Sequence, residues 1–287
     1  MEKEEKAVEI LAGCCQGEAA ALAPGPILAR MEEKSRRRAL EQVPGLKGLL
    51  CCVFPYFDNL APGNLSIYAR GMDYHLAAGR RLDRACEMLK KEFPGFNFRG
   101  YTDVSPFPEV YACARAGLGA MGKNGLLLTQ RWGSYVFCGV VASDLPLEGG
   151  REPCGCEGCG LCRQACPGGA LDENGRLEQG RCLSALTQQR GELTAEQQRL
   201  IGRSGMIWGC DVCQRVCPAN RAPERTELPE FLEQIQATLT AEELEGMSQR
   251  EFRRQYGSRA FAWRGVAPLR RNLALNAAAQ SNDEAGR

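Results

Sequence analysis

The chain has 287 residues, of which 44% are hydrophobic and 25% are charged, and its formal net charge is +1. These values favour a soluble globular protein with one large domain or two smaller ones, and they exclude a strongly basic protein drawn to nucleic acid by its overall field. No apolar run approaches the roughly 18 residues of a membrane span. The opening MEKEEKAVEI lacks the basic start and apolar centre of a signal peptide. We therefore expect a cytoplasmic protein with no membrane partner.

The first half of the chain predicts helices that alternate with strands. Helical patterns cover residues 26–43, 73–93 and 109–119, and the second of them is stopped by Pro94 and Gly95. Apolar runs typical of strands cover residues 46–56, 96–104 and 133–143. The alternation indicates an α/β domain over residues 1–148, in a chain of the α/β or α+β class.

The second half divides into a cysteine-rich module and a short helical segment. Turn-forming residues 145–153 separate the module from the first domain, and residues 221–230 form a second linker. Two capping boxes, TAEE at 240–243 and SQRE at 248–251, predict helix starts. A periodic last helix follows from residue 265, and residues 281–287 are expected to fray. The expected domains are therefore 1–148, 149–222 and 223–287.

Sixteen cysteines in a chain of this kind indicate metal binding rather than disulfides, because the cytosol keeps thiols reduced. Seven of them stand in apolar surroundings and are predicted to be small buried core residues. These seven are Cys14, Cys15, Cys51, Cys52, Cys86, Cys113 and Cys138. Eight others lie in tight spacings between Cys156 and Cys217. Cys154 falls outside that spacing, and we predict no ligand role for it.

The spacing of the eight cysteines predicts two 4Fe–4S clusters. Cys156, Cys159, Cys162 and Cys166 are spaced as C-x2-C-x2-C-x3-C and are followed by proline, which is the bacterial ferredoxin signature. In two-cluster proteins the fourth cysteine of such a run binds the other cluster. A second run of this type contains Cys210, Cys213 and Cys217, and Cys182 can complete it. The predicted ligand sets are Cys156, Cys159, Cys162 and Cys217 for one cluster, and Cys166, Cys182, Cys210 and Cys213 for the other.

The alternative is a pair of zinc sites built from the C-x2-C pairs. That alternative leaves the remaining cysteines of each run, and the proline that follows each run, without an explanation. Iron–sulfur clusters are therefore the preferred interpretation.

Two further patterns are weak. Gly117, Gly119 and Gly122 match a dinucleotide fingerprint, but they follow a predicted helix and lead into a strand, which is the reverse of the required order. Asn124 stands where a P-loop needs serine or threonine. The single histidine, His75, is predicted to be a hydrogen-bonded structural residue with no ligand role.

Several segments together resemble the epoxyqueuosine reductase family. They include YARGMDYH at 68–75, YTDVSPFPEV at 101–110, ARAGLGAMGKN at 114–124 and WGSYVFCG at 132–139. LTQQRGEL, between Cys182 and Cys210, and FAWRGVAPLRRNLALNAA near the end are similar as well. The resemblance covers residues 45–275 in the same motif order. It implies the last step of queuosine synthesis, the reduction of epoxyqueuosine to queuosine in tRNA.

The resemblance also implies cofactors and site residues. A cobalamin would lie between the α/β domain and a ferredoxin-like module, near Lys123, Asn124, Ser134, Cys210 and Asp211. Asp103 would be the proton donor and a cobalamin contact, in an element that reads Asp103-Val104-Ser105-Pro106 where the family has a hydroxyl residue in the second position. An acid in this role is expected to have a raised pKa in an apolar pocket.

The partners that the resemblance implies are tRNA and an external one-electron donor of the ferredoxin or flavodoxin type, and we expect the protein to be a monomer. Seven arginines between residues 250 and 271 are a candidate tRNA surface, with an ordinary solvated helical face as the alternative. The C-terminal segment would be a short form of the family's HEAT-like helical extension.

Two other functions stay open from the sequence. One is a reductase with the same cofactors and a different substrate, as in reductive dehalogenases. The other is a two-cluster electron carrier, a function that would not explain the presence of residues 1–148.

Overall fold

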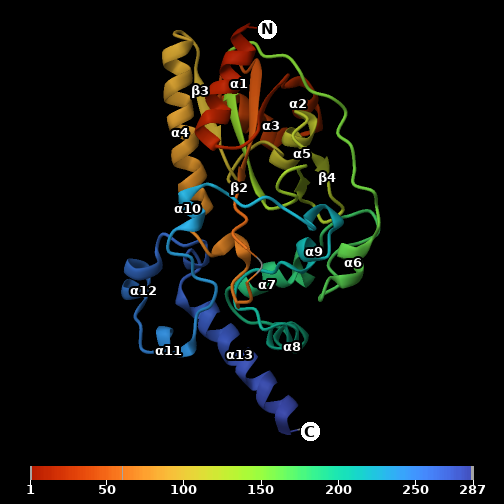
Figure 1. Ribbon diagram of the computed structural model, residues 1–287, viewed down its shortest axis with the longest axis vertical. Helices are drawn as coiled ribbons and strands as arrows, with labels where there is room; N and C mark the ends of the chain where they lie inside the picture. The colour runs from red at the N-terminus through yellow and green to blue at the C-terminus, as the bar shows by residue number, and fades with distance from the viewer. Residues whose placement is uncertain (1, 60, 286–287) are drawn as a thin grey trace.

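The computed structural model describes residues 2–59 and 61–285 and shows a sheet domain, a cysteine-rich module and a helical segment (Figure 1). Each pair of neighbouring strands in the main sheet is antiparallel, and the strand order is β1-β2-β6-β3. These strands are β1 (Ala19–Leu22), β2 (Gly48–Pro55), β3 (Phe98–Tyr101) and β6 (Val136–Ser143). A separate hairpin consists of β4 (Ala120–Met121) and β5 (Leu127–Leu128). The mixed α and β class is confirmed.

Helices cover both faces of the sheet. Alternate side chains of a strand point to opposite faces, and those of β2 enter two different cores. Leu50, Cys52 and Phe54 pack in one core, and Leu49, Cys51 and Val53 pack in the other. The first core is covered by α1 (Glu2–Cys15) and α4 (Tyr74–Glu92), and the second by α2 (Gly25–Arg30), α3 (Glu33–Gln42) and α5 (Glu109–Arg115) (Figure 1). Burial on both faces explains why β2 is a continuous apolar run.

The helix predicted over residues 26–43 is two helices. The backbone is extended at Met31 and Glu32, where α2 ends and α3 begins. The break turns the chain so that Ile27, Met31 and Ala39 all enter the same core. Burial of the three side chains therefore overrides a helical pattern that continues in the sequence.

The seven scattered cysteines are buried in these cores, as the sequence predicts. Each has a relative exposure of 9% or less. Burial raises the pKa of Cys86 to about 11, and the pKa values of Cys113 and Cys138 are also raised. These side chains behave as small hydrophobic residues.

The cysteine-rich module follows β6 after an extended segment. Its helices are α6 (Leu161–Ala165), α7 (Leu183–Gln188), α8 (Ala195–Ser204) and α9 (Val212–Arg215). Gly209 of the module packs directly against Ser66 of the sheet domain. Any larger residue would clash there, because its Cβ atom would lie 2.4 Å from the Cβ of Ser66. A second attachment is Asn220, whose side chain accepts from the amide of Ser134 at 2.7 Å and donates to its Oγ at 2.8 Å.

The last segment contains α10 (Pro229–Leu232), α11 (Ala241–Leu244), α12 (Gln249–Tyr256) and α13 (Val266–Ala285). Both predicted capping boxes are present, at Thr240 and at Ser248. Residues 281–285, where the sequence predicts fraying, continue α13, and residues 286–287 lie outside the described part. In the described residues, no helix combines the length and the apolar character that crossing a membrane requires.

Candidate functional site

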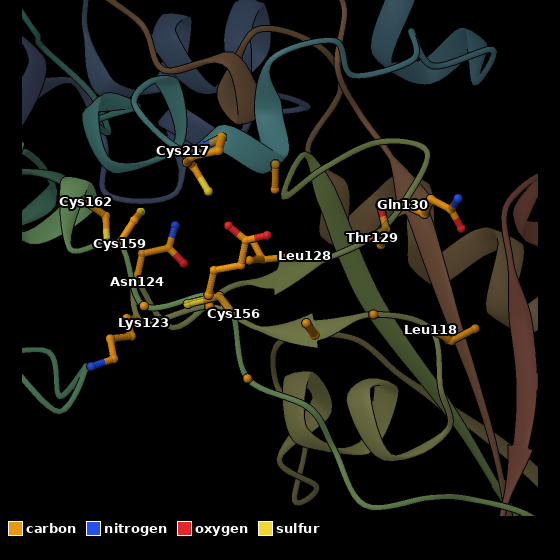
Figure 2. A pocket seen from close by; sticks show the side chains of 18 of the residues that line it. Leu118, Lys123, Asn124, Leu128, Thr129, Gln130, Cys156, Cys159, Cys162 and Cys217 are labelled. Carbon is orange, nitrogen blue, oxygen red and sulfur yellow. The ribbon is translucent and has the colours of Figure 1, made fainter.

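The eight closely spaced cysteines line two separate cavities, four in each. One cavity, of 540 Å³, is lined by Cys156, Cys159, Cys162 and Cys217. Figure 2 shows the side chains of these four cysteines around a common space, with Asn124 beside them. The other cavity, of 310 Å³, is lined by Cys166, Cys182, Cys210 and Cys213. The two groups are the same sets of four that the crossover assignment predicts.

The short helix α6 separates neighbouring cysteines into different cavities. Cys162 lies in its first turn, and Cys166 is its C-cap with an extended backbone, ψ 115°. The extended residue directs its side chain away from the preceding turn. Cys217 likewise has an extended backbone after α9, ψ 128°. One short helix in each run therefore places the last cysteine of that run in the cavity of the other set.

The protonation of the cysteine thiols is consistent with binding of a cationic iron–sulfur core. Burial raises the pKa of Cys210 to about 11 and that of Cys213 to about 12. Without a cation these thiols would stay protonated at neutral pH. A bound metal cluster favours the thiolate, because the ligand must be deprotonated.

An aromatic wall leads from the second cavity into the sheet domain. Tyr56 and Phe137 line that cavity, and their rings are stacked with centroids 4.4 Å apart. Phe137 stacks on Tyr74 at 4.2 Å, and Tyr74 stacks on His75 at 4.1 Å. The wall therefore joins the cavity of Cys210 and Cys213 to the first turn of α4.

Asp103 lies at the far end of this wall. Its carboxylate Oδ2 is 2.8 Å from Nε2 of His75, and the other ring nitrogen of His75 is 2.8 Å from Oδ1 of Asp73. The backbone of Asp103 has a φ of +60°, a left-handed conformation that aspartate tolerates better than most residues. The amide of Asp103 donates to Oε2 of Glu109 at 2.8 Å, and this bond holds the loop in place.

The expectation of a raised pKa for Asp103 is wrong. The hydrogen bond with His75 lowers the pKa of this carboxyl, and its side chain is 54% exposed rather than enclosed in an apolar pocket. In turn, Asp103 and then Asp73 raise the pKa of His75 to about 9. Burial raises the pKa of Glu109 to about 7. At neutral pH the proton of the Asp103–His75 pair therefore resides mainly on the imidazole.

The structure places the other predicted cofactor contacts in different surroundings. Asn124 lines both cavities and Cys210 lines the smaller one. Lys123 lines the larger cavity and donates from Nζ to the carbonyl of Glu173 at 2.8 Å. Ser134 and Asp211 are buried and line neither cavity. Contacts of these two residues with a cofactor stay a prediction.

Both buried residues have structural partners instead. Ser134 is bonded to Asn220, as described above, and its carbonyl and Oγ also accept from Gln214. Asp211 accepts from Ser66 Oγ at 2.5 Å and from the amide of Ile67 at 3.1 Å. These bonds fix the cysteine-rich module to the sheet domain.

Sequence reasoning missed His75, Tyr74 and Glu109 as members of the site. The predicted hydrogen bonding of His75 is confirmed, but its partners are two carboxylates that are 30 residues apart in the chain. The one local signal is Asp73, which caps α4 and thereby directs the ring two residues later.

The arginines of residues 250–271 do not form one cationic face. Arg270 donates to the carbonyls of Leu244 and Met247, and Arg271 donates to that of Gln189. Arg259 donates to the carbonyl of Arg70. Arg270 therefore links parts of the last segment, whereas Arg259 and Arg271 attach that segment to preceding parts of the chain. The exposed arginines of α12 are Arg250, Arg253 and Arg254.

Comparison with known proteins agrees with this arrangement. Residues 155–220 match the family described as "4Fe-4S double cluster binding domain", and residues 36–104 match "Epoxyqueuosine reductase QueG, DUF1730". The fold and the two cysteine sets therefore define a double-cluster iron–sulfur protein. An epoxyqueuosine reductase from Gloeobacter violaceus is 33% identical over 86% of this chain and 82% of its own length. The chain belongs to the epoxyqueuosine reductase family.

Other relatives are longer than this chain. The epoxyqueuosine reductase of Lactococcus garvieae is 37% identical over 77% of this chain, but the match covers 63% of the relative, less than two thirds of its length. A solved structure of an epoxyqueuosine reductase with a tRNA-Tyr epoxyqueuosine-modified stem loop has a TM-score of 0.84 and 26% identity. That match covers 97% of this chain and 81% of the solved chain.

Proposed function

We propose that this protein reduces epoxyqueuosine to queuosine in tRNA, in the cytoplasm, with two 4Fe–4S clusters and cobalamin. The observation that carries the proposal is the aromatic wall between the cavity of Cys210 and Cys213 and the Asp103–His75 pair. In this proposal the cluster at one end of the wall supplies electrons, and the Asp103–His75 pair at the other end supplies the proton. Family membership and the neighbour with a modified stem loop support tRNA as the substrate.

The two cysteine sets suggest a direction for the electrons. Cys159 of the first set is exposed, whereas Cys213 of the second set is half-buried and lines the same cavity as Tyr56 and Phe137. An external donor of the ferredoxin or flavodoxin type would therefore reduce the first cluster. The second cluster would pass electrons one at a time toward the reaction site. In this proposal residues 1–148 bind the cobalamin, 149–222 are the ferredoxin-like module and 223–287 are a short HEAT-like segment.

Beyond its four cysteines, the smaller cavity presents side chains that would contact one edge of a large amide-bearing cofactor such as cobalamin, since a 310 Å³ space that also receives a cluster does not enclose that cofactor. The cavity combines apolar walls from Leu126, Val136 and Phe137 with the side chain of Asn124. The Nδ2 of Asn124 is buried and has no hydrogen-bond partner among the described residues, so it is available to an acceptor on a ligand. Bound against this edge, cobalamin would supply a cobalt centre that accepts single electrons and is strongly nucleophilic toward carbon when reduced.

The Asp103–His75 pair would supply the proton. Removal of an epoxide oxygen as water consumes two electrons and two protons, and an acid beside the departing oxygen promotes that step. The side chain of Asp103 is exposed to solvent, and the imidazole of His75, which is hydrogen-bonded to it, is protonated at neutral pH. Transfer from the imidazole through the carboxyl group to the oxygen would leave the pair ready to be reprotonated from solvent. Asp73 holds the ring in the orientation that this transfer requires.

We expect the reaction rate to fall as pH rises through about 9, because His75 then loses the proton that the pair shares. Replacing His75 with glutamine should lower the rate at pH 7 roughly 10-fold or more and abolish the fall near pH 9. The measurement is single-turnover rate against pH for both proteins. Glu109, Asp73 and Tyr74 remain in the variant, so an unchanged alkaline fall would assign it to another group.

The overall proposal is tested by anaerobic reconstitution with iron, sulfide and cobalamin, followed by reaction with tRNA from a strain that lacks its own reductase. Mass analysis of the nucleosides should show queuosine in place of epoxyqueuosine. A simple two-cluster electron carrier would bind no cobalamin and would leave epoxyqueuosine unchanged. A reductase of another substrate would bind cobalamin and also leave epoxyqueuosine unchanged.

A further inference from the structure

We infer that Trp263 and Arg264 form a stacking platform for a nucleic-acid base at the rim of the active site. The inference rests on the proposed tRNA substrate and adds a subsite for a base other than the one that reacts. It starts from the exposure of the three tryptophans. Trp132 and Trp208 are 3% and 0% exposed, whereas Trp263 is 54% exposed. A single exposed side chain is not a site by itself, so the inference depends on the groups that order and surround this ring.

Trp263 is held rigidly in spite of its exposure. The guanidinium carbon of Arg264 lies 3.6 Å from the centroid of the indole ring, so the cation covers one face of the ring. The indole Nε1 donates to Oε1 of Gln188 at 3.4 Å. The backbone carbonyl of Arg264 accepts from Nε of Arg190 at 3.2 Å. An ordered ring loses little conformational entropy when a second flat group stacks on it.

The platform lies close to the cavity. Gln188 accepts from Trp263 and donates from Nε2 to the hydroxyl of Tyr68 at 3.1 Å. Tyr68 lines the 310 Å³ cavity, and its ring centroid is 6.3 Å from that of Tyr74 in the aromatic wall. Two hydrogen bonds therefore join the exposed indole to a residue of the cavity wall. A polymer that inserts one nucleotide into the site would pass this rim.

The chemistry of the platform favours a nucleic acid over other partners. An exposed aromatic face beside guanidinium groups is the pattern by which proteins bind unpaired bases, since the ring stacks on the base and the cation attracts the phosphate. Arg264 and Arg190 supply the cations here. Arg259, Arg270 and Arg271 donate to backbone carbonyls and are therefore not available to bind RNA. Trp263 and Arg264 of the same segment provide an RNA contact in their place.

The test measures binding of a fluorescently labelled anticodon stem-loop RNA to the full chain with its clusters loaded, by anisotropy at a fixed salt concentration. Trp263→Ala should weaken binding roughly 5- to 150-fold, the range that loss of one stacked base produces. Trp263→Phe keeps a flat ring and should retain most of the affinity. Leu40→Ala removes an exposed apolar side chain of α3 and should bind as the unchanged protein does.

Fluorescence provides a second readout. Because Trp263 is the one exposed tryptophan among the described residues, RNA should quench a component of the emission that is absent in Trp263→Phe. Unchanged affinity of Trp263→Ala, or equal losses in Trp263→Ala and Trp263→Phe, would overturn the platform and leave the proposed function intact. Failure of the unchanged protein to bind the stem loop would overturn both.

Discussion

Replacing Cys166 with serine is expected to remove the cluster of Cys182, Cys210 and Cys213 while the cluster of the neighbouring cysteines, four residues earlier, survives. The reason is geometric, since Cys166 lines the second cavity although it belongs to the first sequence run. Iron content should fall from about eight to about four atoms per chain. Turnover should be abolished, because the surviving cluster is the one farther from the aromatic wall. Iron analysis and electron paramagnetic resonance of anaerobic protein measure both effects.

Double variants distinguish the crossover from the simple assignment. Cys166→Ser combined with Cys210→Ser should lose no more iron than either single variant, because both residues serve one cluster. Cys166→Ser combined with Cys162→Ser should lose nearly all of it. Cys154→Ser is the matched control, since this exposed thiol lines neither cavity and its loss should leave the iron content unchanged. The reverse pattern in the two double variants would contradict the crossover.

The grouping of the cysteines could be predicted from the sequence because it depends on short-range geometry. Spacings of two and three residues, interrupted by one short helix, determine which thiols can face the same space. The capping boxes at Thr240 and Ser248 are predictable for the same reason, since each is complete within four residues. The seven core cysteines follow from the apolar residues on either side of them.

The contact between Asp103 and His75 could not be predicted because the two residues meet only in the folded chain. His75 opens α4, and Asp103 follows β3, 28 residues later. Their contact depends on α4 packing along the sheet, and no local pattern specifies that packing. The expected raised pKa of Asp103 is wrong for the same reason, because the hydrogen bond from His75 lowers the pKa of this carboxyl.

The arginine-rich segment shows a related difficulty. Sequence gives the number of guanidinium groups but not their direction. Arg270 and Arg271 lie side by side in α13, and each donates to carbonyls of a different neighbouring segment. Their role became structural because those carbonyls lie at or beyond the ends of short helices, where the regular helical donors end. The exposure of Trp263 could not be predicted from the sequence either, since tryptophan side chains are buried on average.

Replacing Asp103 with asparagine is expected to lower the rate of epoxyqueuosine reduction roughly 10²- to 10⁴-fold, the usual contribution of a positioned proton donor. Asparagine has the same shape and tolerates the φ of +60° found here, so the loop should keep its conformation. Its amide oxygen can still accept from His75, but it cannot carry the proton onward. The clusters are remote from this loop, so iron content and cluster absorbance should be unchanged. Single-turnover formation of queuosine is the measurement.

The comparison with His75→Gln then identifies the group that delivers the proton. If Asp103 is the final donor, Asp103→Asn should be slow at every pH, whereas His75→Gln should keep some activity that rises toward acid pH, where solvent protonates the carboxyl directly. Val104→Thr controls for disturbance of the loop, because the side chain of Val104 is 69% exposed and the change restores the hydroxyl residue usual at this position in the family. It should react at nearly the original rate. Full activity of Asp103→Asn with an inactive His75→Gln would make the imidazole the direct donor and the carboxylate only its positioning partner.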